Sequence, residues 1–477
     1  MEIVIKGLPS GYEVEHVARI FYPGLPLRQK PATKGEIIYA RIHRRRAAVG
    51  IRAGGRLLVQ RAAVPAGQLP KLTLSALLYR LLKQATGQHP PWGMLTGVRP
   101  VRLLRREAEA AGEMAAHKKL VQGYDVSEEK YSLAHTIAGL QQPFVAGAKA
   151  GHYSLYVSIP FCPSRCAYCS FVSRSIERDA ALVEAYLERL SQELAATARL
   201  AAACGLALQT IYIGGGTPTS LSTAQLARLL EAVRQNFDTA AVAEYTVEAG
   251  RADCTPYEKL ALLKEYGVGR ISINPQTMSN EVLAAIGRRH TAQQVEECFA
   301  NARRAGHTCI NMDIIAGLPK DTLPGFVDTL RQVQALKPEN ITLHTLTLKR
   351  ASNLVIDHAP EAATSPSAMV AAAYPLLREK GYAPYYLYRQ KSTVENLENT
   401  GWALPGQEGM YNIAIMEEIH TILAVGAGGS TKLVNNQLGK IERIFNHKYP
   451  ADYLANFETV IAKKQGVIDF YAGNMGS

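Results

Sequence analysis

The stretch from Tyr156 to Cys169 reads YVSIPFCPSRCAYC, and its cysteines Cys162, Cys166 and Cys169 have the spacing C-x3-C-x2-C. The apolar, β-branched residues before the first cysteine predict a strand that leads into a cysteine loop. Three crowded thiols, in a chain with seven cysteines, make a poor disulfide framework and a good metal or cluster site. Three protein ligands would leave one iron of a four-iron cluster open to another ligand.

Zinc is the main alternative for this loop. A structural zinc site needs four ligands, usually from paired C-x2-C knuckles, whereas the chain has one C-x2-C pair and no nearby pair of histidines. A purely structural role for the three thiols is the remaining interpretation. The other cysteines are scattered and are predicted to be buried as small hydrophobic residues: Cys204, Cys254, Cys298 and Cys309.

Beyond the loop, short β-rich runs alternate with long helical patterns. This rhythm predicts an α/β fold with a parallel sheet and right-handed crossovers, in which six units form an open, partial (β/α)6 barrel. Ligand sites in such folds lie at the carboxyl ends of the strands, where the cysteine loop also falls. The expected strands are Ser154–Ile159, Thr210–Ile213, Tyr245–Glu248, Arg270–Ile273, Asn311–Ile315 and Ile341–Leu346.

The predicted barrel occupies residues 151–350, after a linker at Gly147–Gly151. Residues 1–150 are expected to form an N-terminal mixed α/β domain of unassigned role, with a hairpin turn at Gly54-Gly55 and a leucine-rich helix over Leu72–Leu82. Residues 351–477 are expected to form a C-terminal α+β extension that covers the substrate.

Two segments of this C-terminal extension have more than one interpretation. The tyrosine-dense strand Tyr382–Arg389 would either stack on a flat molecule or pack a domain interface. The glycine-rich turn Val425–Thr431 is a weak candidate for a phosphate loop, because it lacks the lysine spacing of a P-loop.

The composition is that of a globular protein, with 47% hydrophobic and 20% charged residues over 477 positions. No apolar run is long enough to span a bilayer, so no membrane span is expected. The N-terminus lacks the pattern of a signal peptide, which predicts a cytoplasmic protein with reduced thiols.

The chain carries 53 Lys and Arg against 41 Asp and Glu, a net charge of +12. The densest basic run is His43–Arg46, in a strand-like segment with no neighbouring aromatic platform in the sequence. It could be a solvated face, a site for an anionic ligand or nucleic acid, or a contact for a partner protein. For the protein as a whole, nucleic acid is not expected among the partners.

Polar residues and glycines gather at the predicted strand ends. Gly214–Pro218 (GGGTP) directly follows the second strand; these glycines would let backbone N–H groups approach a ligand, although a tight turn is the simpler interpretation. Single polar residues at strand ends are usually caps or surface groups, but several that converge on one barrel mouth indicate a ligand pocket. The candidates are Glu248, Gln276, Arg288 and Asp313.

These motifs together resemble the radical S-adenosylmethionine (SAM) enzymes, and within them the oxygen-independent coproporphyrinogen III oxidase-like family. The resemblance rests on YVSIPFCPSRCAYC, GGGTPT, Thr246–Gly250 (TVEAG), Ile271–Gln276 (ISINPQ) and Asn311–Pro319 (NMDIIAGLP). Trp92–Pro100 (WGMLTGVRP) and Pro384–Lys391 (PYYLYRQK) resemble the HemZ branch of that family in particular.

The resemblance implies a role for each matching residue. Cys162, Cys166 and Cys169 would hold a [4Fe–4S] cluster, and S-adenosylmethionine would chelate its fourth iron. The cofactor contacts it implies are Tyr156, Tyr168, Gly215, Gly216, Thr217, Glu248, Gln276, Arg288 and Asp313.

The family reaction is the oxidative decarboxylation of two propionates of coproporphyrinogen III to vinyl groups, which gives protoporphyrinogen IX. It implies a 5′-deoxyadenosyl radical, a tetrapyrrole substrate and a low-potential electron donor. Four substrate carboxylates would suit a basic pocket, and the net charge of +12 is consistent with one. Candidate propionate partners are Lys349, Arg350, Arg389 and Lys391, for which ordinary surface charge is the alternative.

The sequence departs from the oxidase pattern just after the cysteine loop. Phe171 stands where the oxidase branch has a further cysteine, which makes this ending resemble the related haem-chaperone branch. The His-Asn-x-x-Tyr-Trp haem motif of that branch is replaced by Tyr411-Asn412-Ile-Ala-Ile-Met416, although His420 could serve as another haem ligand. Haem binding or trafficking, and radical chemistry on another substrate, therefore stay open as alternatives.

Overall fold

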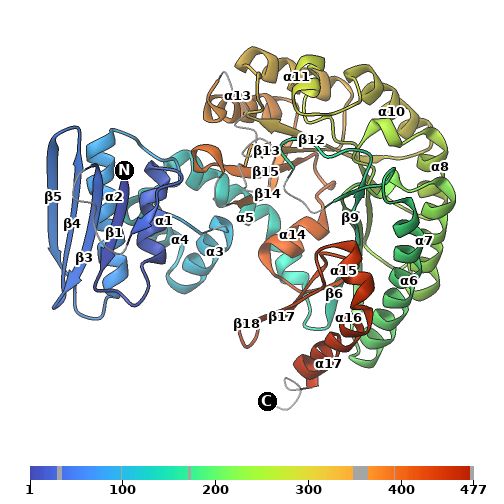
Figure 1. Cartoon of the computed structure of the whole chain (residues 1–477), viewed down its shortest axis with the longest axis horizontal. Helices are drawn as coiled ribbons and strands as arrows, with labels where there is room; N and C mark the ends of the chain where they lie inside the picture. The colour runs from blue at the N-terminus through green and yellow to red at the C-terminus, as the bar shows by residue number, and fades with distance from the viewer. Residues whose placement is uncertain (29–34, 98, 170–172, 348–363, 391–392, 473–477) are drawn as a thin grey trace. The chain divides into compact units, whose positions relative to one another are not determined.

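The computed structural model describes residues 1–28, 35–97, 99–169, 173–347, 364–390 and 393–472 (Figure 1). The chain forms two compact units. The N-terminal unit comprises residues 1–138 and 388–398, and the barrel unit comprises residues 139–387 and 399–477. The division into functional domains at residues 150 and 350 stays a prediction.

The N-terminal unit is a five-stranded sheet with helices on one face (Figure 1). The strand order is β2-β1-β3-β4-β5; β1 is parallel to β2 and β3, while β3, β4 and β5 form antiparallel hairpins. Its elements are β1 (Glu2–Lys6), α1 (Tyr12–Phe21), β2 (Leu27–Arg28), β3 (Ile37–His43), β4 (Arg46–Ala53), β5 (Arg56–Ala63), α2 (Pro70–Thr86), α3 (Pro100–Ala111), α4 (Glu113–His117), the π-helix η1 (Lys118–Gly123) and α5 (Glu128–Gly147), which continues into the barrel unit.

One apolar core joins α1 and α2 to the sheet. Val17 and Leu78 from the two helices pack with Ile38 and Val49 from β3 and β4. The predicted leucine helix is confirmed as α2, except that Leu72 points to solvent with 40% of its surface exposed. The predicted turn at Gly54-Gly55 is also confirmed, with both residues at the positive φ that glycine tolerates.

The barrel unit contains the predicted parallel sheet, and all six expected strands are confirmed. They are β6 (His152–Ile159), β9 (Ala207–Gly215), β10 (Glu244–Glu248), β11 (Arg270–Ser272), β12 (Cys309–Ala316) and β13 (Asn340–Thr345). Neighbouring strands pair in parallel in the order β6-β9-β10-β11-β12-β13. The α/β class with an open sheet of parallel strands is therefore confirmed.

The C-terminal region adds strands to both edges of this sheet, giving the order β14-β15-β13-β12-β11-β10-β9-β6-β16-β17-β18. One addition, β16, is parallel to β6. The added strands are β14 (Ala383–Arg389), β15 (Glu398–Ala403), β16 (Thr421–Val425), β17 (Ser430–Asn435) and β18 (Lys440–Phe445), while β7 (Phe161–Cys162) and β8 (Arg174–Ser175) form a separate pair.

Helices line the outer side of the curved sheet and leave its inner side to the polar residues of the strand ends (Figure 1). Crossover helices such as α6 and α7 bury one apolar face each, for example with Leu190 and Leu230. The helices are α6 (Ala180–Ala203), α7 (Thr223–Asn236), α8 (Tyr257–Glu265), α9 (Asn280–Ala285), α10 (Ala292–Arg304), α11 (Leu323–Ala335), α13 (Pro366–Glu379), α14 (Met410–Glu417), α15 (Pro450–Ala455), α16 (Phe457–Lys463) and α17 (Gln465–Ala472), with 3-10 turns η2 (Pro218–Ser220), η3 (Ala252–Cys254) and η4 (Val394–Asn396).

The structure also resolves the two ambiguous C-terminal segments. Tyr382, Tyr385 and Tyr386 are buried, so this part of β14 is internal packing and no open stacking wall. The glycine-rich turn joins β16 to β17, and the Gly426 N–H donates to the buried carboxylate of Glu193 at 2.7 Å, so that group is not free to bind phosphate.

Two further results concern burial. Of the four scattered cysteines, only Cys298 is fully buried; the other three keep partial exposure, so that part of the prediction was too strong. No helix in the described part of the chain is both long and apolar enough to cross a membrane.

The two units differ sharply in charge. The N-terminal unit has 24 Lys and Arg against 12 Asp and Glu, a net charge of +12. The barrel unit has 29 of each, a net charge of zero. The whole excess charge of the chain therefore belongs to the N-terminal unit.

Candidate active site

The cysteine loop is held against the end of β9 by backbone contacts. Gly216 N donates to Ile159 O and Thr217 N donates to Phe161 O, both at 2.8 Å. A Cβ on Gly216 would lie 2.6 Å from Phe161 O and 2.9 Å from Cys162 Sγ, so only glycine fits there. The N–H groups of Gly216 and Thr217 thus hold the loop, which corrects the expectation that they face a ligand.

The three loop cysteines form no disulfide, and Cys162 lies beside a residue at the end of β9. Cys162 Sγ lies 3.4 Å from Thr217 Oγ1, and Cys169 N donates to Cys166 O at 3.1 Å. Burial raises the pKa of Cys162, so this thiol is protonated until a metal displaces the proton. No three His, Cys, Asp or Glu side chains among the described residues converge on a point that could hold a single metal ion.

Arg288 ties this loop to two strand ends. Its Nη2 donates to the Tyr168 hydroxyl at 2.9 Å, and its Nη1 donates to Asn274 O at 3.1 Å and Gly250 O at 3.3 Å. Burial alone would lower the pKa of Arg288, but Tyr168 and Cys166 beside it raise that pKa overall. Arg288 is thus a fixed cation beside the cluster loop, as the strand-end pattern suggested.

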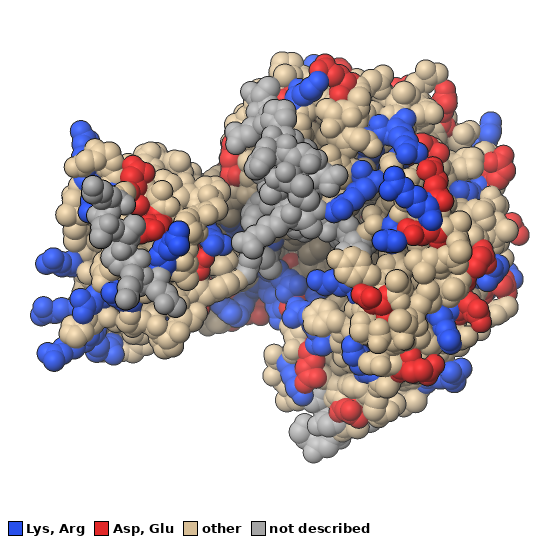
Figure 2. All heavy atoms as spheres, in the orientation of Figure 1, with Lys and Arg blue, Asp and Glu red and all other residues tan. Residues whose placement is uncertain are grey.

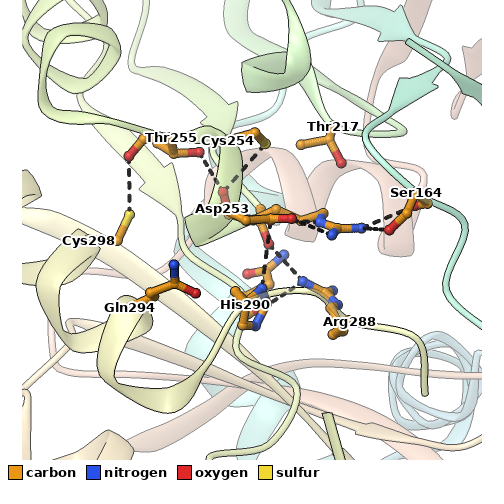
Figure 3. A network of polar contacts seen from close by, with 12 residues as sticks. Ser164, Thr217, Asp253, Cys254, Thr255, Arg288, His290, Gln294 and Cys298 are labelled. Atoms are coloured by element: carbon orange, nitrogen blue, oxygen red, sulfur yellow. Dashed lines mark hydrogen bonds and ion pairs between the residues drawn. The ribbon is translucent and has the colours of Figure 1, made fainter. Parts of the chain in front are cut away.

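A second arginine, Arg251, fixes the same loop from the segment that follows β10, and Figure 3 labels its partners Ser164 and Asp253. Its Nη1 donates to the carbonyl and the hydroxyl of Ser164, at 3.1 and 2.9 Å. Its Nε and Nη2 donate to both carboxylate oxygens of Asp253, at 2.9 and 2.6 Å. Arg251 is 3% exposed, so it is a buried anchor for the loop, while Asp253 remains accessible to solvent.

His290 extends this network behind the arginines. It is buried, and its Nδ1 lies 3.8 Å from Asp253 Oδ1, too far for a hydrogen bond. Burial lowers the pKa of His290, so the ring is neutral at pH 7. The Asp253 carboxylate keeps a lowered pKa because the neighbouring His290 and Arg251 outweigh its burial.

Glu248 lies at the end of β10 on the inner face of the sheet. The Tyr212 hydroxyl donates to its Oε1 at 2.7 Å. Burial raises the pKa of Glu248 to about 7, although the bond from Tyr212 opposes the rise. A Cβ on Gly214 would lie 2.9 Å from the Glu248 carboxyl group, which explains glycine at the first position of GGG.

Three tyrosine rings stack next to Glu248. The ring centroids of Tyr212 and Tyr411 are 4.4 Å apart, and Tyr156 lies 6.1 Å from Tyr212 with its ring nearly parallel. Burial and the charge of Glu248 raise the pKa of Tyr156 and of Tyr212. Tyr156, a predicted cofactor contact, therefore belongs to an aromatic wall inside the barrel.

Asp313 and Gln276 complete the inner face. Asn311 Nδ2 donates to Asp313 Oδ1 at 2.8 Å, and His344 Nε2 lies 3.5 Å from Asp313 Oδ2. Burial would raise the pKa of Asp313, but these neighbours lower it overall. Gln276 has φ at +68° and a buried Oε1 without a hydrogen-bond partner in the described structure. That amide oxygen is available to a ligand.

The structure thus brings the predicted site residues together at one end of the sheet, while several other predicted residues lie elsewhere. Arg389 is buried in the N-terminal unit and donates to the carbonyls of Leu95 and Asn396, so it is neither a surface cation nor a free propionate partner. His420 lies beside the first residues of β6, with Nε2 2.7 Å from Ser154 Oγ, at the opposite end from the cysteine loop. Phe171, Lys349, Arg350 and Lys391 lie outside the described residues.

The residues present fit a three-cysteine cluster with S-adenosylmethionine. Three thiols outside any disulfide share one loop, and two arginines supply positive charge where thiolates would gather negative charge. Behind them lie an unpartnered amide oxygen at Gln276 and the carboxyl groups of Glu248 and Asp313, which suit a ligand with ammonium and hydroxyl groups. A hollow of about 420 Å³ lies on the other side of the loop, beside Cys162, Arg165 and Arg289.

Sequence reasoning missed several residues that the structure places here. Arg251 and Asn311 lie within three residues of recognised motif positions, so the strand-end rule could have found them. Tyr212 lies opposite Tyr156 in the ladder between β6 and β9 and follows from register once the strands are paired. Tyr411 comes from α14, and no local signal connects it to the barrel interior.

Comparison with known proteins agrees with this geometry. A family model described as the radical SAM superfamily matches residues 156–333. The chain is 40% identical over 395 residues to the oxygen-independent coproporphyrinogen-III oxidase-like protein HemZ of Bacillus subtilis (strain 168), a match that covers 81% of this chain and 79% of that protein.

Two further relatives are more distant. The heme chaperone HemW of Lactococcus lactis subsp. lactis (strain IL1403) is 30% identical over 67% of this chain and 80% of its own length. The solved structure of coproporphyrinogen III oxidase (HemN) from Escherichia coli, described as a radical SAM enzyme, matches with a TM-score of 0.53 and 23% identity over 70% of this chain and 73% of that one. At this identity the structural match shows a shared fold.

Proposed function

The chain belongs to the oxygen-independent coproporphyrinogen III oxidase-like family of the radical SAM superfamily, and from this premise we propose that it oxidatively decarboxylates a porphyrinogen. The proposed substrate is coproporphyrinogen III, whose two reacting propionates become vinyl groups in protoporphyrinogen IX. The proposal places the protein in haem biosynthesis. It also places it in the cytoplasm, where the three loop thiols stay reduced and can bind iron.

Membership of the superfamily implies a [4Fe–4S] cluster and S-adenosylmethionine, which together supply a 5′-deoxyadenosyl radical able to take a hydrogen from carbon. In this proposal Cys162, Cys166 and Cys169 would hold the cluster and leave one of its irons to the cofactor. Arg251 and Arg288 hold the cysteine loop in place through Ser164 and Tyr168.

The inner face is proposed to bind and orient S-adenosylmethionine. Glu248 holds a proton on its carboxyl group at acidic pH and releases it near pH 7, which gives a carboxylate beside a cationic ligand. Gln276 offers its free amide oxygen, and Asp313 is kept ionised by Asn311 and His344. An external low-potential donor would supply the electron, and the hollow beside Cys162 is its proposed approach.

The observation that favours the oxidase over the haem-binding alternative is the position of Tyr411. In this chain it stands in the segment that corresponds to the haem motif, and its ring packs on Tyr212 within the barrel. Helix α14 contains no His or Cys to ligate iron. His420 is buried, and burial lowers its pKa to about 4. Neither segment therefore offers an open histidine or cysteine as a haem ligand, although Met410 and Met416 of α14 keep partial exposure.

The net charge of +12 does not support propionate binding by the barrel, because the barrel unit is neutral as a whole. Substrate carboxylates would have to bind individual groups rather than a basic field. The substrate assignment rests on family membership and is the part of the proposal most in need of a direct test.

The test is an anaerobic assay with reconstituted protein, dithionite, S-adenosylmethionine and coproporphyrinogen III. The expected result is release of carbon dioxide and 5′-deoxyadenosine together with a divinyl product. Release of 5′-deoxyadenosine with an unchanged porphyrinogen would overturn the substrate and keep the radical chemistry. Stoichiometric haem uptake without decarboxylation would favour the haem-binding alternative.

A further inference from the structure

One face of the N-terminal sheet is open over β3–β5 and strongly basic, whereas Val4 on β1 is fully buried on the same face. Helices α1 and α2 cover the face that carries Ile38, Ala40 and Val49, so the alternate residues of the strands point away from the core. We call this outer surface the basic face; its exposed Lys and Arg side chains are Lys6, Arg41, Arg46, Arg52 and Arg61, with His43 exposed beside them. Figure 2 shows Lys and Arg projecting from the end of the unit that β3–β5 form.

The register sets these cations in rows across the strands. Lys6, Arg41, Ala48 and Arg61 lie side by side on β1, β3, β4 and β5. His43 and Arg46 form the next row toward the β3–β4 turn, and Arg52 lies in a row on the other side. Neighbouring strands are about 4.8 Å apart, so β3 to β5 present a charged strip about 10 Å wide.

These charges have few internal counter-charges. Strands β3, β4 and β5 contain no Asp or Glu. Among the residues that the structure describes, no carboxylate forms an ion pair with Arg41, Arg46 or Arg61. On β1, Glu2 is the one acidic residue and pairs with Arg28. The basic face is therefore suited to bind a negatively charged molecule, because its arginines have no acidic partner among the described residues.

A flat platform lies between the rows of cations. Tyr39, Gly50 and Val59 occupy one row, with Leu57 in the row beyond. Val59 and Leu57 are 49% and 67% exposed, and Tyr39 is half-buried. Tyr39 lies two residues from Arg41 on the same face, so the basic run does have an aromatic neighbour, which the sequence analysis did not count as a platform.

From these observations we propose that the basic face binds single-stranded nucleic acid, with RNA as the natural form to test. Phosphates would contact the rows that contain Arg41, Arg61, His43 and Arg46, and a base would stack on the platform at Tyr39 and Val59. An open sheet that combines an aromatic platform with flanking cations is the arrangement that single strands use. This departs from the expectation that the chain takes no nucleic acid, and it is independent of the proposed oxidase activity.

The chemistry favours this partner over the other polyanions. A small anion would engage two or three cations, whereas five exposed Lys and Arg side chains spread over four strands match a repeating negative charge. An acidic protein could satisfy the arginines, but it would not need a flat platform in the middle of them. An anionic membrane would need deeper apolar insertion than two exposed aliphatic side chains provide.

The turn between β3 and β4 adds a separate argument. Arg44 and Arg45 form it with φ of 45° and 59°, values that disfavour side chains with a Cβ. The sequence Asn-Gly would adopt this two-residue turn without strain. The two arginines therefore add positive charge to the turn but lower the stability of the N-terminal unit. Strain of this kind collects at functional sites.

The test is fluorescence anisotropy of the full-length protein with a labelled single-stranded RNA of about 12 nucleotides, at salt concentrations between about 50 and 200 mM. We expect micromolar binding that weakens with salt. Arg41→Gln with Arg61→Gln should weaken binding about tenfold and reduce the salt slope by about 1.4, or about 0.7 for each phosphate that is no longer neutralised. Tyr39→Ala should weaken binding roughly tenfold and leave the slope unchanged.

A matched control is Arg228→Gln with Arg234→Gln, two exposed arginines of α7 in the barrel unit, which should bind RNA like the wild type. If the first double variant were poorly folded by circular dichroism, Arg46→Gln with Arg52→Gln gives the same test. Unchanged binding in both pairs would overturn the proposal. Equal affinity for polyglutamate would overturn it in favour of an acidic protein, and equal affinity for anionic vesicles in favour of a membrane surface.

Discussion

The two units use arginine in opposite ways. In the N-terminal unit the arginines of β3–β5 point to solvent without acidic partners, and the unit carries the whole net charge of +12. In the barrel unit the charges balance, and those at the strand ends are buried and bonded: Arg251 with Asp253 and Ser164, and Arg288 with Tyr168.

Because of this difference, the net charge has to be calculated for each unit before it is interpreted. A charge of +12 for the whole chain suggested a pocket for substrate carboxylates. Once the units are separated, it indicates an external polyanion at the N-terminal sheet instead. Buried cations in the barrel act on the cluster loop, where a low dielectric strengthens each contact.

The largest effect should come from the cluster loop itself. Reconstituted Cys166→Ala should lose the visible sulfur-to-iron charge-transfer absorption and nearly all bound iron, because one of three protein ligands is gone. RNA binding by the N-terminal unit should not change. Cys298→Ala is the matched control, since Cys298 is buried in α10 outside the loop. A Cys166→Ala protein that kept full absorption would refute the ligand assignment.

The next effect should come from the buried anchor of that loop. Arg251→Gln removes charge-assisted hydrogen bonds to Asp253 and Ser164 and should cost about 1.5–3 kcal/mol of local stability in the barrel unit. Hydrogen exchange of peptides around Ser164 would measure the loss, together with faster release of iron.

Two variants control the Arg251 experiment. Arg228→Gln breaks an exposed pair with Glu184 and should leave local stability almost unchanged. Arg251→Gln combined with Asp253→Asn should recover part of the loss, because no unpaired charge is left behind. Equal effects of Arg251→Gln and Arg228→Gln would mean that the contacts of Arg251 stabilise the loop no more than an exposed pair does.

A smaller effect should appear in the pH dependence of cofactor binding. Glu248 has a pKa of about 7 in the free protein, because it is buried. Below that pH it is protonated and loses attraction for cationic S-adenosylmethionine, so the Kd should rise by up to about tenfold per pH unit as the pH falls. Above pH 7 the Kd should level off.

Glu248→Gln gives the comparison for this experiment. Its Kd for S-adenosylmethionine, measured by calorimetry with the oxidised cluster in place, should be higher than that of the wild type above pH 7. It should not change with pH below or above pH 7. The same pH dependence in wild type and variant would mean that another group titrates, and Glu248 would lose its proposed role.

The fold followed from local patterns because β-branched runs such as Asn311–Ile315 alternate with helices and can only be buried as parallel strands. Site residues in motifs, including Glu248, Gln276 and Asp313, could be placed at the correct end of the sheet from strand direction alone.

Other features depend on contacts between distant segments. Tyr411 joins Tyr156 and Tyr212 across more than 190 residues, and Arg389 turns inward to bind the carbonyl of Leu95. The use of the Gly216 N–H by Ile159 O also needs the three-dimensional register. The basic face became visible only when alternate residues of three strands were placed on one side.

The smallest expected effect concerns the exposed arginines of the N-terminal sheet. Arg41→Gln with Arg61→Gln should change the stability of the N-terminal unit by no more than about 0.5 kcal/mol, because neither side chain has an ion pair to lose among the described residues. Removing two like charges from a unit with a net charge of +12 could even stabilise it at low salt. Hydrogen exchange of β3–β5 peptides would measure this. A loss above about 2 kcal/mol would mean that these arginines hold the sheet together, and the contrast between surface cations for a partner and buried cations for the fold would fail.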